Sequence, residues 1–329
     1  MTTITTALPA ALRDRLSDAV SQVAAGGILI VLFIALSIAS PAFLTADNLF
    51  NLGSQTSVNA VMAVGVTLVI ITAGIDLSVG SVAALSGVVG VLIMAQLGFG
   101  ALLGILGGIA VGAAAGLVNG LLVSVVGLPP FIATLGMLSV ARGLVLISTG
   151  AVSVFGAPEG FRLLGQGVIG SLPIPILVIV VVAVAGHLVL TRTRLGRYAY
   201  AMGSNAEAAR LSGIPVRRHL TGVYVICGAL AGLGGMIAAS RINSGQPNFG
   251  EGLELDVIAA VVIGGASLFG GQGTVLGSLI GAFLVALIRN GAVLLDINTF
   301  YQNVIIGVII WIAVFWDRFR RRRLGTGIE

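Results

Sequence analysis

The sequence predicts an all-α polytopic membrane protein with about ten transmembrane helices. Of its 329 residues, 57% are hydrophobic and only 9% are charged, whereas a soluble domain carries about 25% charged residues. A soluble protein of this composition would have too little polar surface to face water. Glycine, which is more frequent in membrane helices than in soluble ones, occurs 48 times. These observations exclude a soluble enzyme and favour a helical membrane domain.

Ten apolar segments come close to the roughly 20 residues that a helix needs to cross a bilayer. They are residues 23–39, 58–73, 79–97, 100–123, 131–149, 173–190, 219–240, 256–270, 274–295 and 300–316. We interpret residues 1–22 as a short polar leader before an uncleaved first helix, because more membrane segments follow it. The chain then divides into this leader, one membrane domain over 23–316 and a basic tail over 317–329.

The arginines predict how the helices are oriented in the membrane. All 17 basic residues are arginine, and 13 of them fall at the chain ends or in loops on one predicted side. The positive-inside rule places this side, with both termini and the loop 191–218, in the cytoplasm. Residues 40–57, 150–172 and 241–255 then face outward, and none of these segments is long enough for a separate domain. This placement explains the net charge of +5 better than a nucleic-acid-binding surface does.

Glycine recurs every four residues in two of the predicted helices. The positions are Gly104, Gly108, Gly112, Gly116 and Gly120 in the fourth helix, and Gly273, Gly277 and Gly281 in the ninth. Residues spaced this way share one helix face and allow a second backbone to approach closely. The two stripes lie five helices apart, as do Gly-Ile-Asp-Leu at 74–77 and Gly-Leu-Glu-Leu at 252–255. This spacing suggests two inverted five-helix halves, a common plan among transporters.

Several kinds of chemistry find no support in the residues. The chain has no lysine, so it carries neither a P-loop nor a Schiff-base nucleophile. His187 and His219 lack the partner spacing of a metal site, and the single Cys227 excludes an intrachain disulfide. We therefore predict no catalytic residue, no metal and no cofactor.

Asp76 is the leading candidate for a functional polar group inside the membrane, where an ionisable residue costs about 2.5–3.5 kcal/mol. It lies between two apolar segments, in Gly-Ile-Asp-Leu-Ser-Val-Gly-Ser at 74–81. Small residues here would permit a broken helix, with Asp76 or Ser78 capping its second piece. A broken helix that lines a cavity is also where transporters place solute contacts. Both interpretations remain open, and they are compatible.

Other polar residues extend this candidate pathway. Arg142 would either pair with Asp76 or extend toward the membrane surface, and Asn119 would hydrogen-bond another helix. Pro129 and Pro130 mark the start or an interruption of the fifth helix. Amides and an aromatic ring in 241–255 would suit a hydroxyl-rich solute. The candidate pathway residues are Asp76, Ser78, Asn119, Thr134, Arg142, Asn243, Asn248 and Phe249.

The loop 191–218 contains a short predicted helix over 206–212. Ser204 or Asn205 can cap its start, and Glu207 occupies the favourable first turn. Gly213 ends it, and the proline at 215 prevents its continuation. By these features alone the loop is equally well explained as a docking element or as an arginine-rich connector.

The segment Glu-Ala-Ala-Arg-Leu-Ser-Gly at 207–213 resembles the EAA loop of binding-protein-dependent ABC importer permeases. In that family the loop is the coupling helix that inserts into a groove on the ATPase. Four further stretches resemble the ribose-type sugar permeases of the same family. They lie at 40–45 with 48–51, 73–81, 127–136 and 262–274, so the resemblance covers most of the chain.

This resemblance implies the membrane-spanning subunit of an ABC importer for a monosaccharide, such as ribose or a similar pentose or hexose, in a bacterial inner membrane. It implies three partners: separate ATP-binding subunits, an extracytoplasmic sugar-binding protein, and a second permease copy or paralogue. The implied coupling residues are Gly203, Asn205, Glu207, Ala208, Ala209, Gly213 and Ile214. Two alternatives remain, a branched-chain amino-acid permease of the same family and an ion-driven secondary transporter or channel that uses Asp76.

Overall fold

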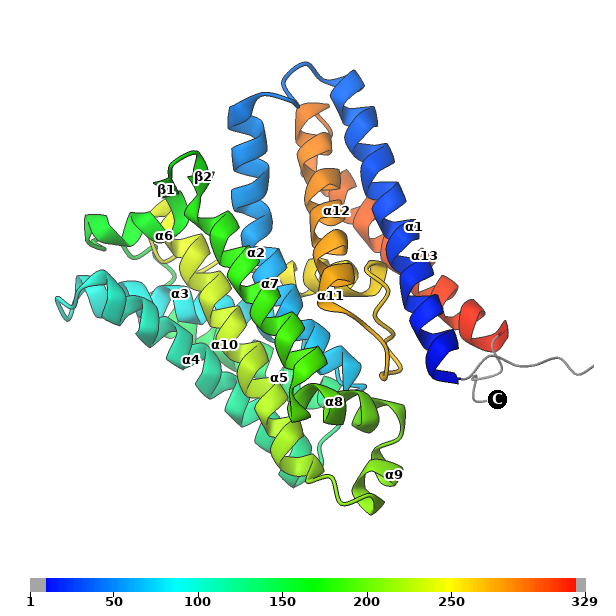
Figure 1. Ribbon diagram of the computed structural model, residues 1–329. Helices are drawn as coiled ribbons and strands as arrows, with labels where there is room; N and C mark the ends of the chain where they lie inside the picture. Colours follow the sequence, from blue (N-terminus) through cyan, green and yellow to red (C-terminus); the bar gives the residue numbers. More distant parts are fainter. Residues whose placement is uncertain (1–9, 324–329) are drawn as a thin grey trace, which may run out of the picture.

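The computed structural model describes residues 10–323, so parts of the predicted leader (1–9) and of the predicted tail (324–329) lie outside the described residues. The described chain is a bundle of helices with a short antiparallel hairpin, which confirms the all-α prediction (Figure 1). Its elements are α1 (Ala10–Ala39), α2 (Ala46–Ile71), α3 (Val79–Ala95), α4 (Ala101–Leu121), η1 (Leu122–Val126), α5 (Pro130–Thr149), η2 (Glu159–Phe161), α6 (Arg162–Gln166), β1 (Val168–Ile169), β2 (Leu172–Pro173), α7 (Ile174–Arg192), α8 (Arg194–Ser204), α9 (Ala206–Leu211), α10 (Val216–Ile242), α11 (Leu253–Ile263), α12 (Val275–Leu294) and α13 (Thr299–Arg323).

Six helical segments within residues 10–323 are long and apolar enough to cross a bilayer. They are Ala46–Ile71, Ala101–Val126, Pro130–Thr149, Ile174–Arg192, Val216–Ile242 and Val275–Leu294. Three further apolar helical stretches, Ala25–Ala39, Val79–Ala95 and Phe300–Ile309, are shorter. The molecule is therefore a polytopic helical membrane protein, and the count of about ten spanning helices stays a prediction.

The helix predicted over 256–270 is wrong in length. Helix α11 has 11 residues and extends about 16 Å, roughly half of the hydrocarbon core. The chain after it forms turns rather than helix, with Gly265, Gly270, Gly271 and Gly273 at positive φ angles. Glycine adopts this left-handed conformation without the steric cost that other residues pay. Hydropathy alone did not separate this glycine-rich turn from an apolar helix.

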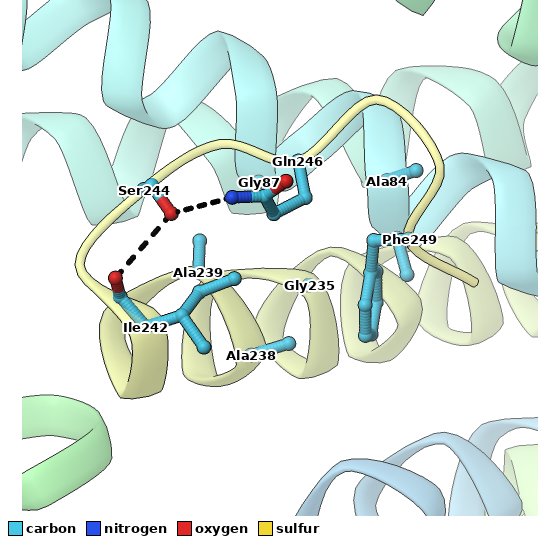
Figure 2. A pocket seen from close by; sticks show the side chains of 10 residues that line it. Ala84, Gly87, Gly235, Ala238, Ala239, Ile242, Ser244, Gln246 and Phe249 are labelled. Carbon is cyan, nitrogen blue, oxygen red and sulfur yellow. Dashed lines mark hydrogen bonds between the residues drawn. The ribbon is translucent and has the colours of Figure 1, made fainter. Parts of the chain in front are cut away.

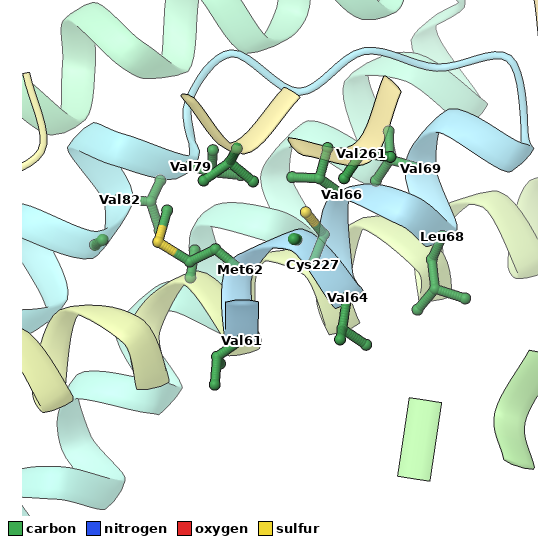
Figure 3. Close-up of a cluster of buried hydrophobic side chains, with 14 of the residues drawn as sticks. Val61, Met62, Val64, Val66, Leu68, Val69, Val79, Val82, Cys227 and Val261 are labelled. Carbon is green, nitrogen blue, oxygen red and sulfur yellow. The ribbon is translucent and has the colours of Figure 1, made fainter. Parts of the chain in front are cut away.

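Helix α2 lies at the centre of the bundle and packs against α7, α8, α10, α11 and α12. Most of its residues between Val58 and Ile71 are buried. Figure 3 shows their side chains meeting Val79 and Val82 of α3 and Cys227 of α10. The mostly apolar second half of α2 suits such an enclosed position.

The predicted glycine stripes lie at close helix contacts. A Cβ atom added to Gly112 of α4 would overlap the carbonyl oxygen of Gly228 in α10, and one added to Gly228 would overlap that of Gly112. In α12, a Cβ on Gly277 or Gly281 would overlap backbone of the α11 segment and the turn after it. The structure thus confirms the packing interpretation of the first stripe and of Gly277 and Gly281. Gly273 does not belong to the second stripe, because it lies in the turn before α12 with a φ angle of +147°.

The N-terminal ends of α3 and α11 meet inside the bundle. Each short helix follows a long helix, α2 or α10, and an irregular connection. A Cβ atom on Gly80 would overlap the carbonyl oxygen of Gly250, and one on Gly250 would overlap that of Gly80. Two broken helices that face one another in this way fit the inverted-repeat plan, although the duplication itself stays a prediction.

Candidate functional site

Helix α9, the predicted docking element, lies at one edge of the molecule beyond α8 (Figure 1). It covers Ala206–Leu211, one residue shorter than predicted. Of the two predicted caps, Asn205 takes the role, since its side chain accepts a hydrogen bond from the Ala208 amide at 2.9 Å. Such a cap satisfies one of the unpaired amides at a helix start. Ala208 is exposed, whereas Ala209 is buried.

The end of α9 has the geometry of a Schellman motif. Gly213 has a φ angle of +81°, and its amide bonds to the carbonyl oxygen of Arg210, while the Ile214 amide bonds to that of Ala209. Arg210 also donates two hydrogen bonds to the Glu207 carboxylate, at 2.6 and 3.0 Å. These bonds and the positive charge of Arg210 hold the pKa of Glu207 below its ordinary value. The exposed pair therefore stays formed at neutral pH and would be lost only in acid.

Helix α8 connects α9 to the interior of the bundle. Gly203 lies so close to the end of α2 that an added Cβ atom would overlap the carbonyl oxygen of Ile71. The same carbonyl accepts a hydrogen bond from the Gly271 amide at 2.9 Å. Tyr200 donates from its hydroxyl to the carbonyl oxygen of Gly273 at 2.7 Å. The turn that follows α11 is thus held directly against α8.

Asp76 and three of the other predicted pathway residues lie together. The Asp76 carboxylate accepts hydrogen bonds from the Ser78 amide at 2.9 Å and hydroxyl at 2.6 Å. Asn119 of α4 donates to the Ser78 hydroxyl at 2.9 Å, which confirms that Asn119 hydrogen-bonds another element. Thr134 of α5 donates to the carbonyl oxygen of Ile75 at 3.2 Å. This Asp76 cluster ties the broken helix to α4 and α5, and all four side chains are buried.

The capping prediction for the broken helix needs correction. Ser78 occupies the N-cap position of α3, but its side chain makes no capping bond there. Its hydroxyl instead donates to Asp76, which accepts within the turn before the helix rather than from the helix itself. A short side chain that bonds its own backbone two residues on stabilises a turn of this kind. The role of the cluster in a solute pathway stays a prediction.

Arg142 does not pair with Asp76, so that interpretation is wrong. Its guanidinium Nη1 donates to the carbonyl oxygens of Pro247 and Phe249, each at 2.9 Å. These acceptors belong to the connection 243–252 between α10 and α11. The arginine thus anchors a loop, because carbonyl oxygens offered by an irregular backbone accept its charge-assisted hydrogen bonds.

We expect the Arg142→Met substitution to loosen the connection 243–252. The variant keeps an apolar stem but loses two charge-assisted hydrogen bonds, each of which contributes about 1.5–3 kcal/mol. Hydrogen–deuterium exchange over this connection should accelerate at least about tenfold. The control is Arg162→Met, since Arg162 is exposed, and it should leave the exchange of residues 243–252 unchanged. Equal exchange rates of this connection in the two variants would contradict the anchoring role of Arg142.

An ion pair that the sequence analysis missed joins α11 to α12. Nη2 of Arg289 lies 2.7 and 2.9 Å from the two carboxylate oxygens of Asp256. The Asp256 side chain is 7% exposed and that of Arg289 is 33% exposed. Opposite charges in two consecutive predicted helices were the signal that could have revealed it, since a charge at membrane depth needs a partner.

Removing one member of this pair should destabilise the protein more than removing both. Breaking a buried pair costs about 3–5 kcal/mol because a charge stays buried alone, and the partial exposure of Arg289 should reduce this to about 2–3 kcal/mol. We expect Asp256→Leu to lower the thermal unfolding temperature of the purified protein in detergent. The double variant Asp256→Leu/Arg289→Leu should recover part of the loss, and a double variant less stable than Asp256→Leu would refute this.

A polar pocket of about 410 Å³ lies where α2, α10, α11 and α12 meet. Its polar lining is Gln55, Asn59, Arg241, Glu251, Asp256 and Arg289. Of the predicted pathway residues, Phe249 lines this pocket. Asn248 is exposed, and Asn243 ends α10 with a positive φ angle of 52°. Gln55 and Asn59 share a helix face because they are four residues apart, so their spacing could have revealed them as a polar pair on one face of α2.

Figure 2 shows a much smaller cavity of about 10 Å³, which shares lining residues with the pocket. Gln246 donates to the Ser244 hydroxyl inside it at 2.9 Å. Ala238, Ile242 and Phe249 line both spaces. The connection 243–252, anchored by Arg142, therefore forms part of the wall of each.

Comparisons with known proteins agree on one family. The family described as branched-chain amino acid transport system / permease component matches residues 48–314. The ribose import permease protein of Escherichia coli K12 is 46% identical over 294 residues, which cover 88% of this chain and 91% of that protein. The counterpart in Bacillus subtilis 168 is 42% identical over 88% of this chain and 90% of its own length. The xylose transport system permease protein of E. coli K12 is 46% identical over 42% of this chain and 35% of its own length. No solved structure matches the chain.

Proposed function

The chain belongs to the permease family of the branched-chain amino acid transport systems, in its ribose-type branch, and we propose that it imports a monosaccharide with energy from a separate ATPase. It is a transport permease subunit of a bacterial inner membrane rather than an enzyme. The monosaccharide class is supported by the ribose and xylose permeases among its relatives. Within the family, a branched-chain amino acid is the alternative cargo.

The observation that carries this proposal is the short helix α9. It is capped at both ends, presents the exposed Glu207–Arg210 pair, and lies at one edge of the bundle (Figure 1). The arginine distribution favours a cytoplasmic position for this edge, where an ATPase would be available. A rigid, protruding helix can transmit a push from a partner because its caps prevent it from unwinding.

In the proposed mechanism, α11 transmits this push. The turn after α11 is hydrogen-bonded to Tyr200 of α8 through Gly273, and the other end of α11 carries Leu253 and Asp256 into the wall of the pocket. The short helix therefore extends from the coupling region to the pocket. Movement of α9 and α8 against the turn would shift α11 and change the pocket, as alternating access requires. The transported solute must favour the two arrangements differently for this coupling to work.

The proposal includes three partners and a topology. Two ATP-binding subunits would dock on α9 of this chain and of a second permease copy or paralogue. An extracytoplasmic sugar-binding protein would deliver its cargo to the outward connections between helices, around 40–45, 150–172 and 243–252, because α2 begins at Ala46 and takes up the rest of the predicted outward segment 40–57. Both termini of the chain would lie in the cytoplasm, as the positive-inside rule favours.

Uptake of labelled ribose and xylose into membrane vesicles tests the proposal. With the binding protein present, we expect uptake to require both ATP and the partner ATPase. Uptake driven by a proton or sodium gradient without the ATPase would overturn the ABC mechanism in favour of a secondary transporter. Uptake of leucine in place of either sugar would support the branched-chain amino-acid alternative and overturn the monosaccharide assignment.

A further inference from the structure

The polar pocket between α2, α10, α11 and α12 is not lined by any residue of α8 or α9. Asn59 lies near the middle of the 26-residue helix α2, about 18 Å along its axis from Ile71, where α8 is attached. Gln55 lies one turn farther from that end. Transporters place their solute sites near the middle of the bilayer, beside broken helices. The pocket has this position, because Leu253 and Asp256 at the start of α11 line it.

The amides of the pocket are available to a ligand. In the part of the chain that the structure describes, the side chains of Gln55 and Asn59 make no hydrogen bond to another residue. An amide that leaves water without a partner costs about 1–3 kcal/mol in proteins. Gln55 is exposed and Asn59 is half-buried, so both amides reach the open space of the pocket, where water or a hydrogen-bonding solute can satisfy them.

The charges of the pocket balance. Two arginines, Arg241 and Arg289, stand against two carboxylates, Glu251 and Asp256, and one cation and one anion are already paired within 2.7 Å. The Nε of Arg289 is buried and has no hydrogen-bond partner in residues 10–323, so Asp256 does not satisfy the whole guanidinium. A balanced lining suits an uncharged solute that both donates and accepts hydrogen bonds.

The size and the aromatic wall agree with a sugar. The volume of about 410 Å³ lies within the range of about 300–1,000 Å³ for small-molecule sites. Phe249 offers an apolar ring that lines both the pocket and the smaller cavity. One apolar wall and a few convergent polar groups are the usual make-up of a site that binds a small molecule.

We propose that this pocket holds the transported monosaccharide during its passage, with Gln55 and Asn59 as its hydrogen-bonding groups and Phe249 as its apolar wall. The proposal rests on the function proposed above and assigns that function to particular residues. It moves the solute contacts away from the Asp76 cluster, which is buried and holds the turn before α3.

The first test compares leucine substitutions in the complete transporter, reconstituted with its ATPase and binding protein. We expect Gln55→Leu and Asn59→Leu each to reduce ribose or xylose uptake about five- to tenfold, the size of one lost hydrogen bond. ATP hydrolysis stimulated by the binding protein should persist. The control Gln96→Leu removes an exposed amide at the end of α3, outside the pocket, and should transport normally.

The outcomes separate the two proposals. A wild-type transporter without ATP-driven sugar uptake would refute the proposed function itself. A wild-type transporter that is active beside equally active Gln55→Leu and Asn59→Leu variants would refute the pocket alone. Reduced leucine uptake in these variants, in a transporter that carries leucine, would overturn the assignment to a sugar.

A second measurement does not depend on transport. Cys227 is the sole cysteine and is buried, so a Cys227→Ser background allows a new thiol to be followed alone. We expect Asn59→Cys in this background to react with a charged, water-soluble thiol reagent. Val140 of α5 is 54% exposed, and we expect it to face lipid, so Val140→Cys should stay unreactive. An unreactive Asn59→Cys would show that no water reaches the pocket and would overturn the proposal.

Discussion

The Gly213→Trp substitution is expected to reduce ATP-driven uptake to background while the protein still inserts and folds. The left-handed backbone at this position, with a φ angle of +81°, costs about 1–2 kcal/mol for a residue other than glycine. A Cβ atom here meets no other atom within 4 Å, so the indole ring would project outward. It would do so at the end of α9, on the surface proposed to dock on the ATPase.

Uptake by vesicles and co-purification of the ATPase check this expectation together. The control is Gly98→Trp, since Gly98 has a similar φ angle of +69° and equally open surroundings but lies in the turn between α3 and α4. The Gly98→Trp variant should be destabilised by the same left-handed backbone conformation but should keep normal uptake. Normal uptake by Gly213→Trp would contradict the docking role of α9.

The Gly112→Ala substitution should have the largest effect on stability. The added methyl would overlap backbone atoms of Gly228 and Gly232 in α10, and neither helix can move away without breaking the rest of the α4–α10 contact. Overpacking costs about 1–3 kcal/mol where side chains can adjust, and a clash between two backbones should reach or exceed the upper end. We expect a lower unfolding temperature in detergent and a reduced yield of folded protein.

A second glycine of the same helix provides the control. A Cβ atom on Gly107 would meet the tip of the flexible Ile93 side chain, which can rotate away. Gly107→Ala should therefore be neutral or stabilising, because alanine favours a helix by up to about 1 kcal/mol over glycine. Equal losses of stability at Gly112 and Gly107 would show that the stripe is not a special contact.

Much of the fold could be predicted because the bilayer constrains it strongly. Long apolar runs must form helices in lipid, and each of the ten predicted segments contains a helix. The prediction for 256–270 was wrong because an apolar, glycine-rich turn satisfies its backbone through neighbouring elements, such as the Gly271 bond to Ile71. Hydropathy does not show whether the backbone of an apolar segment is hydrogen-bonded within a helix or to neighbouring elements.

The candidate site was predicted unevenly for a similar reason. The caps of α9 depend on residues only a few positions apart, so Asn205 and Gly213 could be identified from spacing. The partners of Arg142 and Asp256 lie 105 and 33 residues away, and no local rule connects them. The wrong pairing of Arg142 with Asp76 came from charge alone, without knowledge of which backbone carbonyls were free.

The sequence by itself determined the class of the protein, its apolar segments, its glycine stripes and the local structure of α9. Each of these follows from short-range chemistry: hydropathy over about 20 residues, a four-residue repeat along a helix, or a capping residue beside its helix. Only the tertiary structure decided that α3 and α11 meet end to end, that α11 connects α8 to a pocket, and that Gln55 and Asn59 line it. These features depend on close packing between distant segments, where the direction of a side chain is set by neighbours that the local sequence does not specify.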